Sequence, residues 1–262
     1  MASSPAVLCN KALAHLGVVG GITTLSSDTT AAGGYCRTFY DGAVLETLKA
    51  APWSCAKKVA TLTLHETLTA SRDEEWTYAY RLPEDSILPR RIRLYGNRTP
   101  GPNQEVPFEL FADTDSTAWS AVTAYAANNY ASLTTGATVV WYRCILATTN
   151  NTPPNATYWT AITGGPPKLL HCDIDDAVLE YTMLLSDPTR FDGDLESAIA
   201  ARLAYDIAPG VTKSDATAIR GQVAGVYNAL MSAAIAADAR SRVADVAPPS
   251  GWELARYRAG RR

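Results

Sequence analysis

The sequence predicts an α+β protein: a helical domain, with an N-terminal helix pair and long C-terminal helices, that carries a small antiparallel sheet and a small all-β inserted domain. Three observations predict this class. Apolar residues recur at helical spacing near both ends of the chain, and they alternate from Trp53 to about Phe111. Between positions 113 and 167 the composition shifts to Thr, Asn and aromatic residues. We therefore expect one discontinuous domain over residues 1–112 and 168–262 and an inserted β-domain over 113–167.

Two short amphipathic helices are expected at the N-terminus. Ser4 followed by Pro5 is typical of a helix start, and the apolar spacing continues to Gly17. Asp28 is expected to cap the second helix, which Pro52 ends. We expect this helix pair to pack on the sheet.

The sheet is expected to begin with one strand that carries Ala60, Leu62 and Leu64 on the same face. It should pair as an antiparallel ribbon with a strand over Trp76–Tyr80, with Pro83 ending the ladder. Further strands are expected at 91–95, 106–111, 169–174 and 178–184, so that the insert lies between consecutive strands.

The C-terminal part is expected to be helical. Residues 194–205 are rich in Ala, and Thr212 with Asp215 resembles a capping box before a long last helix. Ala, Ser and Gly dominate the other faces of this helix, so it is either a subunit-contact element or an ordinary core helix. Its apolar stripe is Ile219, Val223, Val226, Leu230 and Ala234.

Composition excludes several classes of protein. The net charge is -3, which excludes a histone-like surface that attracts nucleic acid everywhere. No apolar run approaches the roughly 18 residues of a membrane helix, so no membrane insertion is expected. The first five residues lack the features of a secretory signal. The five cysteines are scattered and are expected to be buried free thiols.

No catalytic or metal motif emerges, so we expect neither an enzyme nor a cofactor or metal. The three histidines, His15, His65 and His171, stand in no catalytic motif. Ser54 and Lys57 match S-x-x-K, but without its companion motifs we expect a structural role. The carboxylates of residues 173, 175 and 176 lack the glycine and glutamate of a calcium loop and are expected to be solvated.

Several motifs, in this order, resemble the tail tubular protein A family, the head-to-tail adaptors of short-tailed bacteriophages. The family's "N-x-A-L-x-x-L-G" helix matches residues 10–17, and its "P-W-x-x-A" turn matches 52–56. Its "Y-x-Y-x-L-P" strand matches 78–83, and "D-P-x-x-F-D" matches 187–192. An Ala-rich helix pair and a late Trp-x-x-x-Arg follow. The resemblance covers about the first 110 and the last 95 residues.

The resemblance implies a structural protein of the virion tail, assembled in the host cytoplasm. It implies a homo-oligomeric, dodecameric ring at the head-tail interface, below the portal protein and above the tail nozzle protein, with genomic DNA passing through and making transient, non-specific contact. By its charge, the C-terminal arm is either a solvated tail or a phosphate-contacting arm, and the resemblance implies a portal-docking arm. Its candidate residues are Trp252, Arg256, Arg258, Arg261 and Arg262.

The insert resembles small carbohydrate-binding modules of the chitin-binding type. Trp119, Tyr142 and Trp159 are candidate glycan-facing residues, because exposed aromatic rings stack on sugars. The alternative is that these rings form the core of a small β-domain. An alternative function follows, a glycan-binding tail component whose insert contacts surface glycan or another virion protein. Hydrolysis is not expected, because it needs two placed carboxylates and the insert offers only Asp115, with Asp113 at its boundary.

Overall fold

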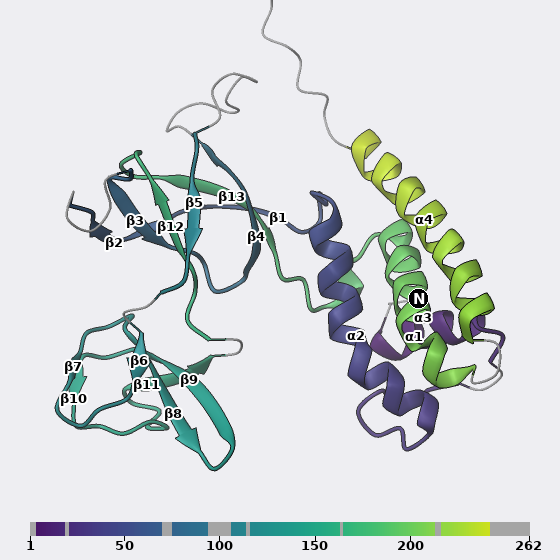
Figure 1. Cartoon of the computed structure of the whole chain (residues 1–262), viewed down its shortest axis with the longest axis horizontal. Helices are drawn as coiled ribbons and strands as arrows, with labels where there is room; N and C mark the ends of the chain where they lie inside the picture. The colour runs from purple at the N-terminus through teal and green to yellow at the C-terminus, as the bar shows by residue number, and fades with distance from the viewer. Residues whose placement is uncertain are drawn as a thin grey trace, which may run out of the picture. The chain divides into compact units, whose positions relative to one another are not determined.

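The protein is a mixed α+β molecule in a computed structural model (Figure 1). The structure describes residues 4–18, 21–69, 75–93, 106–113, 116–162, 165–212 and 216–241. Within these residues it contains four α-helices and several antiparallel sheets. The chain divides into two compact units, one formed by Met1–Ala56 with Leu185–Arg262 and the other by Lys57–Leu184.

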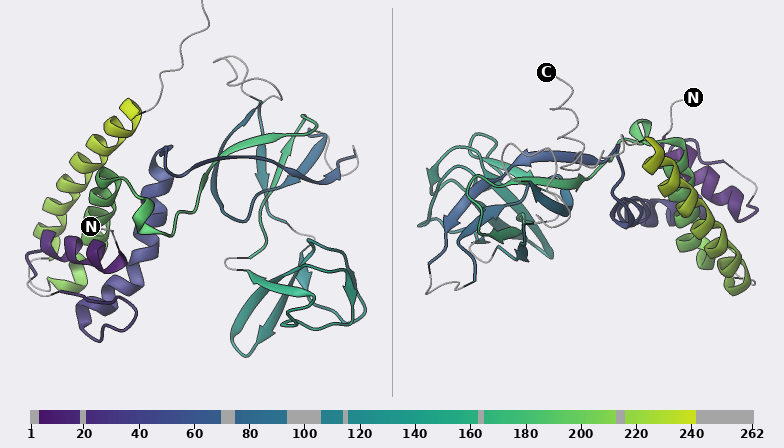
Figure 2. Two further views of the ribbon diagram at one scale, coloured as in Figure 1. Left: turned by 180° about the vertical axis from the view of Figure 1, so that it is seen from behind. Right: turned by 90° about the horizontal axis from the view of Figure 1, so that it is seen from above.

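The first unit is helical, and α3 is its centre (Figure 2). Buried positions recur along α3 on nearly every turn, and α1, α2 and α4 all pack against it. The expectation that the two N-terminal helices pack on the sheet is therefore wrong, because α3 covers their apolar faces. The helices are α1 (Pro5–His15), α2 (Ala31–Ala50), α3 (Gly193–Val211) and α4 (Ala216–Ser241).

Side-chain caps mark the starts of α1 and α2. The hydroxyl of Ser4 accepts a hydrogen bond from Val7 N at 3.3 Å, which confirms the start of α1. The predicted cap of α2 was wrong: Thr30, not Asp28, is the N-cap, and its hydroxyl accepts from Gly33 N at 3.0 Å. Asp28 accepts from the backbone N of Thr30 at 2.8 Å and thereby fixes the residue that caps the helix.

The end of α3 and the last helix differ in part from expectation. Thr212 is the C-cap of α3 and donates its hydroxyl hydrogen to the Ala208 carbonyl at 2.8 Å. Its expected capping-box partner, Asp215, lies outside the described residues. On α4, Val223 and Ala234 are buried as predicted, whereas Val226 is 40% exposed.

Two antiparallel sheets of the second unit share one core. Side chains from both sheets meet there, including Tyr80, Ile92, Leu170, Leu179 and Tyr181. One sheet has the order β1-β13-β4 and the other β2-β3-β12-β5. The strands are β1 (Lys57–Thr61), β2 (Thr63–Thr67), β3 (Tyr78–Arg81), β4 (Ser86–Arg93), β5 (Glu109–Phe111), β12 (Leu169–Cys172) and β13 (Val178–Met183).

The single strand expected through Leu62 is in fact two strands in different sheets. Leu62 is buried, and its N–H donates to the Ala177 carbonyl at 2.9 Å, between the two ladders. The chain therefore turns from one sheet into the other at this residue. The predicted ribbon is confirmed for the second half, where β2 pairs antiparallel with β3 and Leu64 lies opposite Tyr80.

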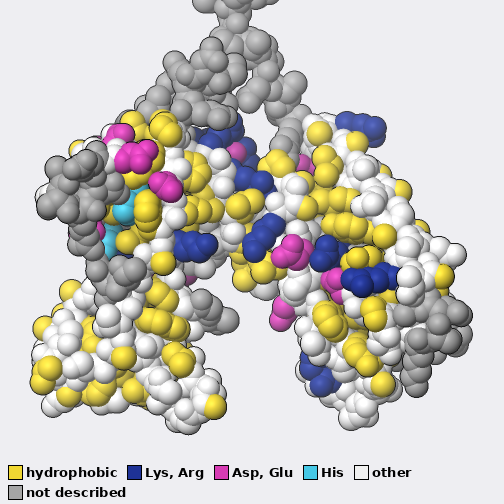
Figure 3. Space-filling model, in the orientation of Figure 1, with side chains coloured by type: hydrophobic (Ala, Val, Ile, Leu, Met, Phe, Trp, Pro, Cys, Tyr) yellow, Lys and Arg dark blue, Asp and Glu magenta, His cyan; other side chains and the backbone are white. Residues whose placement is uncertain are grey.

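The segment that follows β5 forms small sheets of its own. After it the chain continues into β12, which pairs with β5. Its own core contains Tyr125, Ala131, Tyr142, Cys144 and Trp159. In Figure 3 this segment (lower left) shows mostly apolar and uncharged surface. Its strands are β6 (Thr117–Ala118), β7 (Ala124–Tyr125), β8 (Tyr130–Thr135), β9 (Thr138–Cys144), β10 (Thr148–Thr149) and β11 (Trp159–Ile162).

None of the helices in the described residues combines the length and the apolarity that crossing a membrane requires. The five cysteines are all free thiols, four of them buried and Cys55 half-buried.

Candidate functional site

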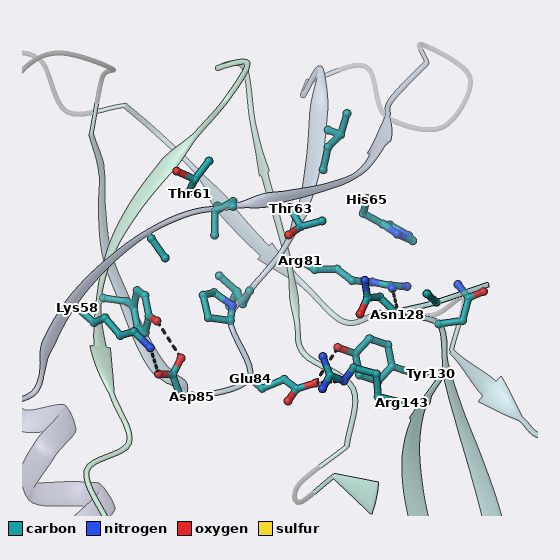
Figure 4. Close-up of a pocket in the computed structure, with 18 residues that line it drawn as sticks. Lys58, Thr61, Thr63, His65, Arg81, Glu84, Asp85, Asn128, Tyr130 and Arg143 are labelled. Carbon is teal, nitrogen blue, oxygen red and sulfur yellow. Dashed lines mark hydrogen bonds and ion pairs between the residues drawn. The ribbon is translucent and has the colours of Figure 1, made fainter. Parts of the chain in front are cut away.

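A polar cavity of about 720 Å³ lies within the Lys57–Leu184 unit, between strands of the shared core and the inserted segment (Figure 4). It is lined by side chains from five separate stretches of the sequence. Those that carry charge or hydrogen-bonding groups include Lys58, His65, Arg81, Glu84, Asp85, Asn128, Tyr130, Arg143 and Tyr181.

Arg81, at the end of β3, makes three contacts toward the insert. Its Nη1 donates to the Asn128 carbonyl, its Nη2 lies 3.4 Å from Asp113 Oδ2, and its guanidinium carbon lies 5.0 Å from the centre of the Tyr130 ring. The carboxylate of Asp113 is fully buried, and it also accepts from the Ser116 hydroxyl at 2.8 Å. Arg81 therefore holds the start and the middle of the insert against the sheet.

Glu84 also contacts the insert, at Arg143 and at Tyr130. Arg143 Nε lies 3.1 Å from Glu84 Oε1, and the Tyr130 hydroxyl donates to the same oxygen at 3.2 Å. Burial, and then the nearby Glu84 charge, raise the pKa of Tyr130 to about 12. Tyr130 is thus a neutral hydrogen-bond donor at physiological pH.

Asp85 binds two groups on the sheet side. Lys58 Nζ lies 2.6 Å from Oδ2, and the Tyr181 hydroxyl donates to Oδ1 at 2.8 Å. Burial and the Asp85 hydrogen bond raise the pKa of Tyr181 to about 12. Figure 4 shows Lys58 pointing at Asp85.

The charged side chains of this cavity are paired with one another. Each of the two acidic side chains in its lining binds a cation and a tyrosine: Glu84 binds Arg143 and Tyr130, and Asp85 binds Lys58 and Tyr181. Its lysine and arginines are balanced by Glu84, Asp85 and the adjacent Asp113, so the cavity does not favour a polyanion. The contacts of Arg81 and Glu84 fix the insert to the sheet.

The structure places two of the three candidate glycan-facing residues in the insert's core. Tyr142 is 8% and Trp159 is 3% exposed, and Trp159 lies edge-on to Tyr125 with ring centres 5.0 Å apart. A ring packed among neighbours offers no face to a sugar, so the glycan-facing prediction is corrected for these two residues. Trp119 is half-buried and packs against the same core.

The candidate portal-docking arm, with Trp252, Arg256, Arg258, Arg261 and Arg262, lies outside the described residues, as does Asp115. The two residues of the S-x-x-K match have separate partners. Ser54 donates its backbone N–H to Asp238 Oδ1 at 2.8 Å, and Lys57 Nζ lies 3.1 Å from Glu180 Oε1.

The carboxylates of residues 173, 175 and 176, after β12, were expected to be solvated. One of them has a structural role. Asp173 accepts from the backbone N and the hydroxyl of Thr77, at 3.0 and 2.9 Å. Asp175 and Asp176 are exposed. Among the residues that the structure describes, no three His, Cys, Asp or Glu side chains converge as a metal site would require.

Sequence reasoning missed the cavity and a second group of charges around Glu180 on β13. The cavity had no local signal, because its partners come from segments that only the fold brings together. The second group had one: the run Pro89-Arg90-Arg91-Ile92-Arg93 holds three arginines, two of which, Arg91 and Arg93, fall on the strand expected at 91–95.

Comparison with known protein families finds no match for this chain, and comparison with the curated proteins finds none either.

Proposed function

We propose that this chain is a structural virion protein, the head-to-tail adaptor of a short-tailed bacteriophage. In this proposal a homo-oligomeric ring joins the portal protein to the tail nozzle and forms part of the DNA exit channel. The observation that carries it is that the residues of the motifs at 10–17, 52–56 and 187–192 are packing and turn-forming residues of one helical unit.

The N-terminal motif supplies the clearest example. The side-chain amide of Asn10 donates to the Ile22 carbonyl at 2.9 Å, and its oxygen accepts from Ile22 N at 2.7 Å. These two hydrogen bonds hold the loop after α1 against the helix. An asparagine at this place in the motif therefore has a structural reason.

The other motifs act in the same way. Trp53 is 2% exposed and donates its indole N–H to the Thr47 carbonyl at 2.8 Å, which closes the end of α2. Pro188 and Phe191, from the "D-P-x-x-F-D" segment, are buried before α3 begins. These motif residues maintain a helical scaffold, which supports the proposal of an assembly protein.

A ring needs surfaces on each copy that can contact the next copy. The long α4 offers one candidate, because Val226 is 40% exposed and its neighbours Ala229 and Ala233 on the same flank are also exposed. Small side chains allow a second helix to approach closely. We propose that this flank of α4 contacts a neighbouring subunit.

The alternative function, a glycan-binding tail component, has less support. Only Trp119 of its three candidate rings keeps partial exposure, whereas sugar sites need an open aromatic face.

The proposal is tested by mass photometry of the purified chain, alone and mixed with portal rings from the same virus. We expect the portal peak to gain the mass of a ring of adaptor subunits. A chain that stays monomeric at every salt concentration, and that binds polysaccharide instead, would refute the adaptor proposal in favour of the alternative.

A matched pair of variants tests the contact on α4. Val226→Glu introduces a charge on the proposed contact flank and should prevent ring formation. Asn228→Glu places the same charge on an exposed position of the same helix, about 160° away from Val226 around its axis. Less effect is expected there. Equal behaviour of the two variants would remove α4 from the proposed interface.

A further inference from the structure

Four basic side chains gather on the outer face of the β1-β13-β4 sheet. They are Lys57 on β1 and Arg90, Arg91 and Arg93 on β4, and they surround the central strand β13. The opposite face of β13 carries Leu179 and Tyr181, which belong to the core. The basic side chains therefore lie on the side of the sheet that faces away from its own core.

A β-bulge brings the fourth cation to this face. In the pairing of β13 with β4, Glu180 lies opposite Arg91 and Tyr181 lies opposite Pro89, so Arg90 is the extra residue. With regular alternation, Arg90 would point to the other face from Arg91. Instead its Nε donates to the Thr182 hydroxyl at 2.9 Å, and Thr182 shares the face of Glu180.

Glu180 is the acid at the centre of this group, and its carboxylate is only 9% exposed. Lys57 Nζ lies 3.1 Å from Oε1, Arg91 Nη2 lies 3.1 Å from Oε2, and Arg93 contacts Oε2 through both Nε, at 2.9 Å, and Nη2. A carboxylate offers about four acceptor positions, so these cations use its capacity fully.

The group therefore keeps an excess of positive charge. Lys57, Arg91 and Arg93 share the single carboxylate of Glu180, which leaves two positive charges in excess among these four side chains, although the whole chain has a net charge of -3. Lys57, Arg91 and Arg93 have side chains that are 41%, 29% and 23% exposed, so solvent and ligands can reach them. Glu180 holds the three side by side despite their mutual repulsion. Figure 3 shows Lys and Arg side chains on the part of the molecule that carries these strands.

The chemistry of the group points to phosphate diesters. Guanidinium groups match phosphate oxygens through paired N–H donors. The side chains that share this face on β1 and β13, namely Lys57, Val59, Thr61, Val178, Glu180 and Thr182, include no aromatic ring on which unpaired bases stack. The group spans three strands, about 10 Å, which is enough for two to four phosphates.

We propose that the basic face formed by Lys57, Arg90, Arg91 and Arg93 is a sequence-independent binding surface for the phosphate backbone of duplex DNA. If the chain is an adaptor, this face is where it contacts the passing genome, which deepens the proposed function. The DNA-binding surface itself does not depend on ring formation.

The test is fluorescence anisotropy of the full chain with a 12-base-pair duplex over 25 to 150 mM salt. Because few phosphates are neutralised, binding should be weak, and the logarithm of affinity should fall with that of salt with a slope of about -3. Lys57→Gln and Arg90→Gln should each reduce the steepness of this slope by about one. Arg91→Lys keeps the charge, so the slope should stay the same while affinity falls a few-fold.

Lys58→Gln is the matched control. Lys58 is on the same strand as Lys57, but it points to the other face and pairs with Asp85. It should leave both affinity and slope unchanged, and circular dichroism checks that each variant is folded. Absence of binding at 25 mM salt would overturn the proposal. So would an equal loss in Lys58→Gln and Lys57→Gln, or tighter binding of polyglutamate than of DNA, which would assign the face to an acidic protein. Portal association is measured separately, so failure here leaves the adaptor proposal standing.

Discussion

Trp53 joins two kinds of stabilisation in one side chain: its ring is buried and its indole N–H bonds to the end of α2. Trp53→Ala removes both and leaves a cavity that the neighbouring helices cannot fill. We expect the free energy of unfolding to fall by about 3 to 5 kcal/mol. Urea denaturation measures this change. Phe39→Ala, at a position that is 39% exposed on α2, should lose less, and equal losses would contradict the assignment.

Glu180 makes the free energy of unfolding depend on pH in the acidic range. Burial alone would raise its pKa, but hydrogen bonds from Arg93, Lys57 and Arg91 outweigh burial and hold the pKa below its ordinary value of 4.5. A lowered folded pKa contributes stability above the ordinary value, and this contribution is lost as the pH falls from about 4.5 through the lowered pKa. Wild-type protein should therefore lose stability steeply in this range.

Glu180→Gln tests this dependence, because it removes the titrating group while keeping the shape. We expect its thermal midpoint to be lower than that of the wild type at pH 7 and to change less between pH 5 and pH 3. Glu109→Gln, an exposed position on β5, should follow the wild-type profile. If the two variants have the same pH profile, Glu180 is not the responsible group.

At the scale of elements, the same substitution is expected to have different effects at two glycines of the helical unit. A Cβ on Gly210 in α3 would lie 2.5 Å from the Tyr35 ring, whereas a Cβ on Gly221 in α4 would meet no atom within 4 Å. Gly221→Ala should raise the free energy of unfolding by about 0.5 to 1 kcal/mol, because alanine favours a helix. Gly210→Ala should gain less or lose stability, because the ring must move.

A double-mutant cycle identifies the cause at Gly210. In a Tyr35→Ala background the clash disappears, so Gly210→Ala should then stabilise the protein as Gly221→Ala does. Chemical denaturation of the four proteins measures the coupling. A zero coupling energy would show that Tyr35 does not limit this position.

Local signals explain which elements could be predicted from the sequence. The helices were predictable because caps and apolar spacing act within a few residues, as at Ser4 and Pro5. Thr30 replaced Asp28 as the cap because both residue types cap well, and only the backbone path distinguishes them. The turn at Leu62 was missed because strict alternation continues through a residue at which the chain changes sheets.

The candidate sites were harder to predict than the helices and strands, because they are formed by residues that lie far apart in the sequence. The aromatic residues of the insert form a recognisable pattern, but the pattern does not distinguish a core from an exposed sugar platform, and Tyr142 and Trp159 proved to be core residues. The cavity joins Arg81 and Glu84 to Asn128, Tyr130 and Arg143, which no spacing rule links. The bulge at Arg90 likewise becomes visible only once the register of β4 is known.

At the scale of the whole molecule, the continuous segment 57–184 has the properties of a unit that folds alone. Its two cores are formed entirely by its own residues. Lys57 pairs with Thr182, so the two ends of the segment are neighbours in an antiparallel ladder and cutting there leaves no strand unpaired. The segment is long enough to bury these cores, since domains of this size commonly fold independently.

We therefore expect the fragment 57–184 to express as a folded protein with a β-type circular dichroism spectrum and a cooperative thermal transition. The complementary protein, with Ala56 joined to Leu185 through a short Gly-Ser linker, should keep a helical spectrum, because α3 remains packed against α1, α2 and α4. A fragment 57–184 that is unfolded on its own, while the joined helical protein folds, would mean that the β-rich unit needs the helical unit for stability. In that case the effects of Glu180→Gln could not be assigned to the β-rich unit alone.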